Sequence, residues 1–415
     1  MSKQEIAVIG LGYIGLPTSA AIARCGVSVI GVDVDAFTVA EINAGRSPVF
    51  EPDLDQAVAD AVAAGLLTAS LDVPTADAFL IAVPTPFLGD HQPDLSYVRA
   101  ATASIAPRLR GGGEVVILES TSPPYTTRQV SQWLSEARPD LTFPHQSSTP
   151  DVHVAYCPER VLPGRIMTEI VTNDRIIGGL TPRCSERAAE VYRIFCEGQV
   201  LLTDATSAEM VKLTENSFRD VNIAFANELD AVCSEVGVDA WEVIRLANCH
   251  PRVNILNPGP GVGGHCIAVD PWFIVSAAPR QARLIRTARE VNDARPGSVV
   301  AAVAEAVGGA TAPVVACLGL AFKANVEDLR ESPAVAITRS IALRLPHATV
   351  LSAEPHVGKL PALLDDIPNL IFADGTDAVT KADVVVLLVD HRQFRAITSD
   401  DLDGKRVIDT RGFWR

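Results

Sequence analysis

The stretch IAVIGLGYIG (residues 6–15) decides the fold of the first half of the chain. An apolar run, predicted as a strand, leads into three glycines and then into an alanine-rich segment predicted as a helix. In this order the first glycine permits a tight turn, the second lets a pyrophosphate approach the backbone, and the third lets the helix pack on the strand. The loop residues predicted to contact a dinucleotide are Gly10, Gly12, Tyr13, Ile14 and Gly15.

The next apolar run supports this interpretation because it ends at Asp33, about 20 residues after the glycines. A carboxylate at that place binds the ribose 2′-hydroxyl and repels a 2′-phosphate. A glycine turn with a capping aspartate is the alternative, but the complete strand–loop–helix–strand–acid order favours a dinucleotide site. The sequence therefore predicts NAD, rather than NADP, as the cofactor.

Short Val/Ile-rich runs recur along the chain, separated by alanine-rich helical segments. Near-continuous apolar runs are typical of strands that are covered on both faces, and hence of parallel sheets with helices between the strands. The expected strands are 5–9, 28–33, 78–83, 114–119, 152–156 and 175–177, and later 314–320, 348–352, 384–389 and 406–409. Helices are expected over 205–236, 238–247 and 270–291.

This pattern predicts an α/β protein with two Rossmann-like, doubly wound domains joined by a central region of long helix. The predicted boundaries are 1–204 for the NAD-binding domain, 205–300 for the central helical domain with a dimer surface, and 301–415 for the second, smaller α/β domain.

The composition excludes several classes of protein. Hydrophobic residues make up 48% and charged residues 20%, and the formal charge of −15 argues against broad nucleic-acid binding and against an anionic membrane surface. No apolar stretch reaches the roughly 18 residues of a membrane helix, and no signal-peptide pattern precedes the first strand. The eight cysteines include no CxxC pair. We expect a cytoplasmic, reduced protein without a nucleic-acid, membrane or metal partner.

The glycine-rich segment 259–264 is the most unusual part of the chain, and Cys266 follows it closely. Four glycines in six residues let backbone N–H groups converge on a small group, and a helix is expected to start near Asp270. A thiol near a helix start ionises more easily, and the thiolate is the nucleophile. A protease-like pair with His265 is not favoured, because no third orienting residue is visible. We expect six other cysteines to be buried and inert: Cys25, Cys184, Cys196, Cys233, Cys249 and Cys317.

Three polar residues of the predicted long helix, Lys212, Asn216 and Arg219, share one face because they are spaced at i, i+4 and i+7. Apolar neighbours, including Phe218 and Val221, predict that the rest of this helix is largely buried. The lysine is either a desolvated amine or part of a solvated stripe, and spacing alone leaves both open.

Other polar residues follow predicted strands, at the sheet edge where ligands of doubly wound folds bind. These residues are Thr85, Glu119 to Thr121, and Glu159 with Arg160 in the first half, and Lys323 and Arg330 in the second. A rigid turn at Thr85 and a local salt bridge at Glu159 are the alternatives. Ser332 is predicted to cap a helix that starts at Pro333, and His250 with Arg252 offers a cation for a phosphate.

Taken together, these motifs closely resemble the UDP-glucose/GDP-mannose dehydrogenase family, in order and over essentially the whole chain. The motifs are the glycine fingerprint, 83–86, 119–121, 157–160, Lys212 with Asn216, 261–270, and Lys323 to Ser332. UDP-glucose members typically carry a proline-lysine pair after the cysteine, where this chain has 267–269. The runs around Lys212, His250 and Cys266 resemble members that act on UDP-N-acetyl-D-mannosamine. Val326 departs from a common threonine, with little expected effect.

The resemblance implies oxidation of the substrate's C6 alcohol to a carboxylate with two NAD, in a homodimer. Cys266 would trap the aldehyde, Lys212 and Asn216 would stabilise the oxyanion, and three residues would serve water and proton transfer: Asp270, Thr121 and Glu159. The implied contacts of a UDP-N-acetylhexosamine are Arg160, Val161, Lys212, Asn216, Arg219, His250, Arg252, Gly263, Phe322 and Lys323. By the same resemblance Arg330 and Thr121 join Thr85 among the NAD contacts.

Three alternatives stay open at this point. A UDP-N-acetylglucosamine 6-dehydrogenase would share the chemistry and differ in the epimer at C2. A nucleotide-binding regulator would keep the fold without turnover. A two-electron alcohol dehydrogenase would stop at the aldehyde and would not need Cys266.

Overall fold

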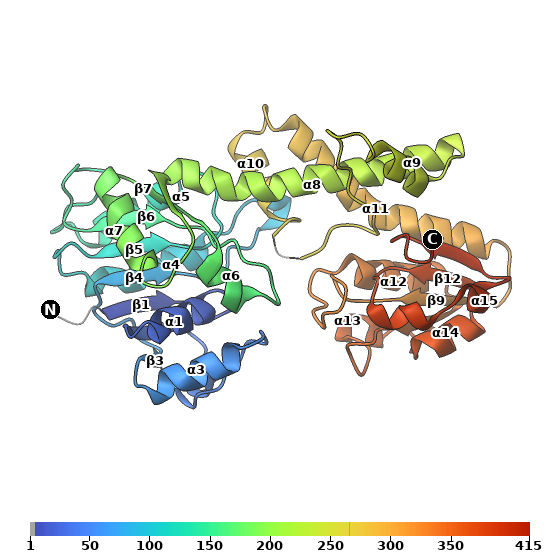
Figure 1. The fold of residues 1–415 in the computed structure, drawn as a ribbon, viewed down its shortest axis with the longest axis horizontal. Helices are drawn as coiled ribbons and strands as arrows, with labels where there is room; N and C mark the ends of the chain where they lie inside the picture. The colour runs from blue at the N-terminus through green and yellow to red at the C-terminus, as the bar shows by residue number, and fades with distance from the viewer. Residues whose placement is uncertain (1–4, 265) are drawn as a thin grey trace. The chain divides into compact units, whose positions relative to one another are not determined.

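The computed structural model describes residues 5–264 and 266–415. The chain divides into two compact units, Met1–Glu215 with Trp272–Ala278, and Asn216–Pro271 with Pro279–Arg415. Each unit contains a sheet that is covered by helices on both faces (Figure 1). The predicted α/β class, with two sheet domains joined by a long helix, is confirmed.

The first sheet has eight strands in the order β3-β2-β1-β4-β5-β6-β7-β8. The direction of strand addition reverses at β1, and the carboxyl ends of β1 and β4 therefore form the edge where a ligand is expected. All pairs are parallel except β6 with β7. The strands are β1 (Glu5–Ile9), β2 (Ser28–Val32), β3 (Leu67–Ser70), β4 (Ala78–Ile81), β5 (Val115–Leu118), β6 (His153–Tyr156), β7 (Arg175–Gly179) and β8 (Val200–Asp204).

Both faces of this sheet are buried along its inner strands, which explains why these strands are apolar at consecutive positions. In β1, Val8 packs in a core with α1 (Gly15–Arg24), whereas the adjacent Ala7 packs in a core with α4 (Ser96–Ile105). The remaining helices on the first face are α2 (Ala36–Asn43), α3 (Leu54–Ala63), α6 (Ile166–Thr172) and α7 (Pro182–Tyr192), and α5 (Thr126–Ala137) lies on the second.

The second sheet is fully parallel and has five strands in the order β11-β10-β9-β12-β13. These are β9 (Val314–Leu318), β10 (Thr349–Ala353), β11 (Leu370–Phe372), β12 (Val384–Leu387) and β13 (Arg406–Asp409). One face packs on α11 (Arg283–Val307), α12 (Pro333–Arg344) and α13 (Ala362–Asp365), and the other on α14 (Gly375–Lys381) and α15 (Ser399–Leu402).

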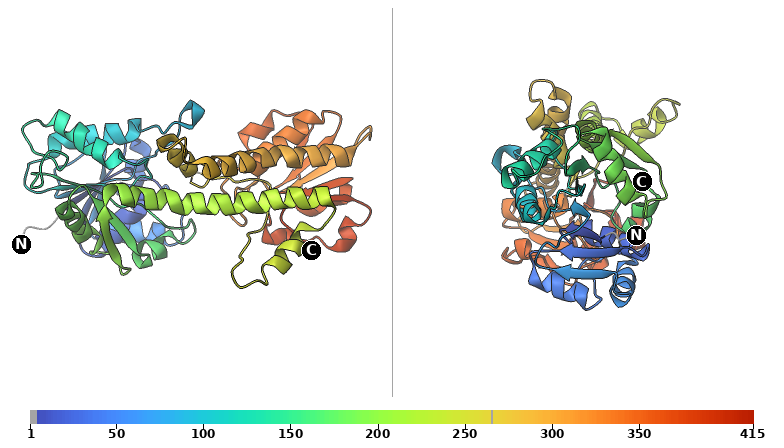
Figure 2. Two further views of the ribbon diagram at one scale, coloured as in Figure 1. Left: turned by 90° about the horizontal axis from the view of Figure 1, so that it is seen from above. Right: turned by 90° about the vertical axis from the view of Figure 1, so that its left-hand side faces the viewer.

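The central helix α8 (Ala205–Val236) is a single uninterrupted helix of 32 residues, with the predicted bounds (Figure 2). It is followed by α9 (Ala240–Ala247) and α10 (Asp270–Ala277). The expectation of one helix over 270–291 is wrong: α10 ends before Pro279, which lacks the N–H that a helix needs, and α11 starts at Arg283. Short 3₁₀ turns are η1 (Gly89–His91), η2 (Ala106–Arg108) and η3 (Arg392–Ala396). Within the described ranges, no helix combines the length and hydropathy needed to span a membrane.

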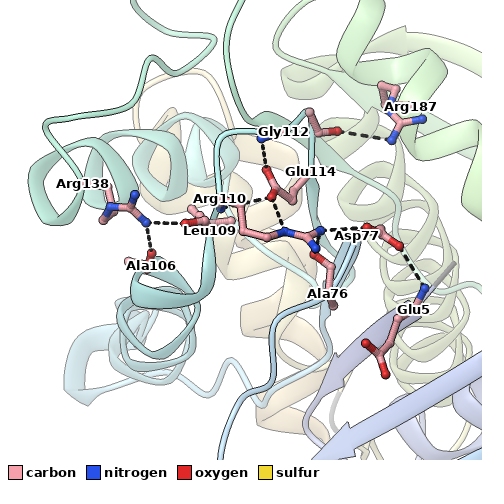
Figure 3. Close-up of polar contacts among 11 residues, drawn as sticks. Glu5, Ala76, Asp77, Ala106, Leu109, Arg110, Gly112, Glu114, Arg138 and Arg187 are labelled. Atoms are coloured by element: carbon pink, nitrogen blue, oxygen red, sulfur yellow. Dashed lines mark hydrogen bonds and ion pairs between the residues drawn. The ribbon is translucent and has the colours of Figure 1, made fainter. Parts of the chain in front are cut away.

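A cluster of charges lies at the amino ends of the first sheet's strands, away from the expected ligand edge (Figure 3). Arg110 contacts Asp77 at 2.8 Å and Glu114 at 2.9 Å, and Asp77 also accepts the backbone N–H of Glu5 at 3.0 Å. Because ligands of such sheets bind at the carboxyl ends of the strands, we assign this cluster to the support of the fold.

Candidate active site

The glycine loop after β1 has the shape that a dinucleotide requires. Gly10 has φ +93°, and a Cβ there would lie 2.6 Å from the carbonyl oxygen of Ala82. A Cβ at Gly15 would lie 1.8 Å from the oxygen of Gly10, so strand and helix are in close contact. At Gly12, by contrast, a Cβ would meet no described atom within 4 Å. The one exposed glycine therefore leaves open the space that a pyrophosphate would fill.

Asp33 connects the end of β2 to this loop. Its Oδ2 accepts the backbone N–H of Leu11 at 2.9 Å, and its Oδ1 accepts that of Asp35 at 3.0 Å. The carboxylate is half-buried and fixed beside the glycines. The loop and the acid together fit NAD.

The loops after β4 and β5 are joined by hydroxyl groups. Thr85 Oγ1 donates to the carbonyl oxygen of Thr121 at 2.6 Å, and Ser120 Oγ donates to that of Val83 at 2.7 Å. The structure thus brings two predicted site residues, Thr85 and Thr121, to one sheet edge.

A buried polar cluster lies at the carboxyl ends of β5 and β6. Arg175 donates to Glu159 at 2.7 Å, and both side chains are at least nine-tenths buried. The neighbouring Glu119 accepts a hydrogen bond from Tyr192 Oη at 2.6 Å, while its Oε2 has no partner among the described residues. The sequence singled out Glu119 and Glu159, but not their partners Tyr192 and Arg175, because these contacts join residues distant in the chain.

Burial, with the neighbouring Glu159 carboxylate, raises the pKa of Glu119 to about 7, against the opposing effects of Tyr192 and Arg175. Burial also raises the pKa of the Cys157 thiol, so this cysteine stays protonated. The cluster therefore holds two carboxyl groups, one guanidinium and one exchangeable proton near neutral pH.

Arg160, predicted to contact a phosphate, is engaged with α8. It pairs with Glu215 at 2.6 Å and donates to the carbonyl oxygen of Asp174 at 3.1 Å. Lys212, one turn before Glu215 on α8, is half-buried, as is Val161. The guanidinium and the ammonium are thus presented by adjoining parts of the first unit.

In the second unit, Cys266 is exposed and lies four residues before Asp270, the first residue of α10. The backbone N–H of Asp270 donates to the carbonyl oxygen of Cys266 at 2.9 Å, and Asn216 Nδ2 donates to the Asp270 carboxylate. Three predicted catalytic residues, Cys266, Asp270 and Asn216, are therefore linked, and the expected helix start at Asp270 is confirmed. His265 lies outside the described residues.

The glycines before Cys266 serve close packing. A Cβ at Gly263 would lie 2.5 Å from the carbonyl oxygen of Glu331, and a Cβ at Gly264 would lie 3.5 Å from the Phe322 ring. Gly259 is held on both sides, because its N–H donates to Asn227 Oδ1 and its oxygen accepts from Arg295 Nε, each at 2.9 Å. Close packing on the second domain therefore accounts for these glycines, and the sequence alone did not predict this packing.

The loops of the second domain present the remaining candidates. Phe322 is half-buried, Lys323 is exposed, and Arg330 pairs with Asp328 at 2.6 Å. Ser332 Oγ accepts the N–H of Ala334 at 3.2 Å, which confirms the predicted cap of α12. The exposed candidates that lie on α8 or after α9 are Arg219, His250 and Arg252.

Two expectations about burial are wrong. Phe218, expected in a buried face of α8, is 68% exposed. Cys25 and Cys249, expected to be buried, are exposed because they lie one and two residues after the ends of α1 and α9, and Cys196 is only half-buried.

A dinucleotide-type glycine loop with its acid, together with a second α/β domain, is typical of an NAD-dependent oxidoreductase. Comparison with known proteins identifies the family. Residues 4–196 match the NAD binding domain of the UDP-glucose/GDP-mannose dehydrogenase family, 206–294 its central domain and 316–415 its UDP binding domain. The chain belongs to this family.

Among similar proteins, an NDP-N-acetyl-D-galactosaminuronic acid dehydrogenase of Ralstonia nicotianae is 58% identical over 412 residues, covering 99% of this chain and 96% of the relative. A UDP-N-acetyl-D-mannosamine dehydrogenase of Escherichia coli is 55% identical over 424 residues and covers both chains completely. The solved UDP-D-ManNAc dehydrogenase of Pyrococcus horikoshii superposes with a TM-score of 0.87 at 36% identity, covering 99% of this chain and 96% of that one.

Proposed function

We propose that this protein oxidises the C6 alcohol of UDP-N-acetyl-D-mannosamine to the uronate, with four electrons passing to two NAD. The observation that carries the proposal is the exposed Cys266, one turn before the start of α10 and linked through Asp270 to Asn216. Relatives named for this activity, 55–56% identical over the full length, support the substrate. The proposal places the enzyme in the cytoplasm as a homodimer.

The cysteine explains how two oxidations occur on one bound sugar. Bound NAD supplies the hydride acceptor for each oxidation. When the first hydride leaves C6, a base takes the hydroxyl proton, and an aldehyde forms. The Cys266 thiolate then bonds to the aldehyde carbon, and the carbonyl oxygen takes a proton to give a thiohemiacetal. Loss of the second hydride and of that proton leaves a thioester. Water attacks the thioester carbon, the C–S bond breaks as the thiolate leaves, and both protons of the water are lost, so that the carboxylate is released.

Each step requires residues that the sequence singled out. Lys212 and Asn216 stabilise the oxyanion of the tetrahedral species, and removing one such donor costs about 3–4 kcal/mol in the transition state. Asp270 and Thr121 hold the attacking water, and Glu159 accepts its proton. The cations that offset the two phosphates are Arg160, Arg219, Arg252 and Lys323, and Arg330 contacts the NAD side.

The test counts NADH formed per sugar consumed across UDP-N-acetyl-mannosamine, -glucosamine and -galactosamine. We expect two NADH per sugar and the fastest turnover with the mannosamine nucleotide. Cys266→Ser is expected to form free aldehyde and to stall before the second oxidation. One NADH per sugar would contradict the four-electron scheme, full turnover by Cys266→Ser would contradict the thioester, and binding without NADH would indicate a regulator.

A galactosamine nucleotide is a second candidate substrate because two relatives named for the galactosaminuronic acid product are 57–58% identical. The two sugars differ at C2 and C4, and both carry the same primary alcohol at C6. The same panel separates them: a larger kcat/KM for the galactosamine nucleotide would replace the first choice without changing the mechanism.

A further inference from the structure

One buried pair of side chains, Glu354 and His391, holds both ends of the loop that carries Phe322 and Lys323. Glu354 follows β10, and His391 follows β12, so both lie at the carboxyl edge of the second sheet. Both side chains are completely buried. The loop follows β9, the central strand of this sheet.

The carboxylate holds the start of the loop and the imidazole holds its end. Glu354 Oε2 accepts the backbone N–H of Leu320 at 2.7 Å and that of Ala321 at 3.0 Å. His391 Nδ1 lies 3.0 Å from the backbone nitrogen of Asn325, and its Nε2 lies 2.9 Å from Glu354 Oε2. Residues 322–324 are therefore fixed on both sides by one connected pair.

The backbone contacts determine how the imidazole is protonated. Because a backbone N–H can only donate, Nδ1 of His391 is the acceptor, and the proton lies on Nε2, where it is donated to Glu354. Burial raises the pKa of Glu354, but the hydrogen bonds from His391 and from the backbone outweigh it and lower the pKa below its ordinary value. The pair therefore consists of an ionised Glu354 carboxylate that accepts a hydrogen bond from a neutral His391 imidazole.

Glu354, His356 and His391 also have the composition of a metal site, since their ligand atoms lie within 4.8 Å of one another. However, Glu354 Oε1 accepts the N–H of His356 at 3.0 Å, and Oε2 already has three donors. The hydrogen bonds account for the cluster without an ion.

The clamped loop also touches the segment that carries the cysteine. The Phe322 ring lies against Gly264, two residues before Cys266, and the N–H of Gly264 donates to the Glu331 oxygen at 3.4 Å. At the far end of the loop, Asn325 has φ +61°, and its side chain accepts the N–H of Arg392 at 3.0 Å. A shift of the loop would therefore change both Lys323 and the support of the cysteine segment.

We propose that His391 and Glu354 are positioning residues for the nucleotide half of the substrate, and that they act by fixing the loop of Phe322 and Lys323. This inference rests on the proposed function only in assigning the loop to the nucleotide. It predicts that damage to the pair weakens UDP binding and leaves NAD binding intact, because the NAD loop belongs to the other unit.

The test measures UDP and NAD affinity by calorimetry, together with KM for both substrates, in His391→Phe and His391→Asn. The phenylalanine keeps an aromatic ring but leaves the Asn325 N–H and one carboxylate site unpaired, so UDP affinity and the sugar-nucleotide KM should worsen about tenfold or more. NAD affinity should stay within about twofold. Asparagine places an amide oxygen close to the position of Nδ1, and it should recover part of the UDP affinity.

His356→Asn is the matched control, because the His356 side chain gives no hydrogen bond to Glu354, and it should bind UDP as the native protein does. Glu354→Gln keeps the volume but turns an NH₂ toward backbone donors, so it should weaken UDP binding even if His391→Phe folds poorly. Equal UDP affinity in native protein, His391→Phe and Glu354→Gln would overturn the inference. If His356→Asn lost as much UDP affinity as His391→Phe, the inference would also be wrong, and the result would indicate that Glu354, His356 and His391 bind a ligand together. Native protein that fails to bind UDP would instead refute the proposed function.

Discussion

At the scale of single residues, charge decides which carboxyl group is protonated in the buried polar cluster at the carboxyl ends of β5 and β6. Two buried carboxyl groups, Glu119 and Glu159, share one buried cation, Arg175, and this cation bonds directly to Glu159. A second buried negative charge without a partner is costly, so the proton is held by Glu119. The hydroxyl of Tyr192 marks Glu119 as the group that keeps a hydrogen-bond partner in either state.

This arrangement predicts how stability depends on pH. The pKa of Glu119 is raised from 4.5 to about 7 in the folded protein, so its neutral form stabilises the fold below pH 4.5, and this contribution is lost as pH rises through 7. The shift corresponds to about 3 kcal/mol. Glu119→Gln imitates the neutral acid and should gain free energy of unfolding relative to the native protein between pH 5 and pH 8.

The measurement is urea unfolding of both proteins across this pH range. Glu327→Gln, at an exposed position, is the control, and its free energy of unfolding relative to the native protein should not change with pH. A difference between Glu119→Gln and the native protein that does not change with pH would show that Glu119 does not titrate in this range.

At the scale of elements, the strands that the sequence failed to predict share one property. β3, β8 and β11 all lie at the outer positions of their sheets. The exposed or half-exposed positions of β8, and the short length of β11, remove the continuous apolar run by which the inner strands were predicted. By contrast β1 and α8 have the predicted bounds, because each is buried or periodic along its whole length.

The candidate site divides in the same way. Features set by neighbours in the chain were predictable, such as the turn at Gly10 and the cap at Ser332. Contacts between distant residues were not, since no local pattern records them: Asn216 with Asp270 and Arg175 with Glu159 join different elements. The roles proposed for these residues and the three-domain boundaries stay predictions.

Phe218 belongs to an exposed apolar stripe along α8. Phe218, Phe225 and Val232 are spaced by seven residues, lie on one face, and are 68%, 55% and 51% exposed. An apolar stripe of this kind on a long helix is typical of an interface, and the proposed homodimer would cover it.

Phe225→Asp should therefore dissociate the proposed homodimer. Losing the burial of one phenylalanine costs about 1.5–3 kcal/mol, and a two-fold interface loses it twice, so the dissociation constant should rise about a hundredfold or more. Sedimentation equilibrium measures this directly, with Glu228→Gln on the same helix as a polar control. A native monomer, or a variant that stays dimeric at the same concentration, would contradict this use of the stripe.

At the scale of the whole molecule, each sheet has its own hydrophobic cores, so each unit can respond separately to its ligand. The glycine loop and Asp33 belong to the first unit, and the loop of Phe322 and Lys323 belongs to the second. A ligand at a hundred times its dissociation constant stabilises the state that binds it by about 2.7 kcal/mol. NAD should therefore stabilise the first unit, and UDP should stabilise the second.

Hydrogen exchange followed by peptide mass checks this division. NAD should slow exchange in the peptides around Gly12 and Asp33, and UDP in those around Phe322. Asp33→Ala removes the acceptor of the Leu11 N–H as well as the expected ribose contact. At an NAD concentration that slows exchange in the native protein, the variant should show no slowing by NAD, whereas the slowing by UDP should be unchanged. Loss of both effects would mean that Asp33 supports the whole fold, and retention of both would mean that the cofactor is held without it. Because both measurements are made on one protein, the UDP effect reports whether the variant is folded.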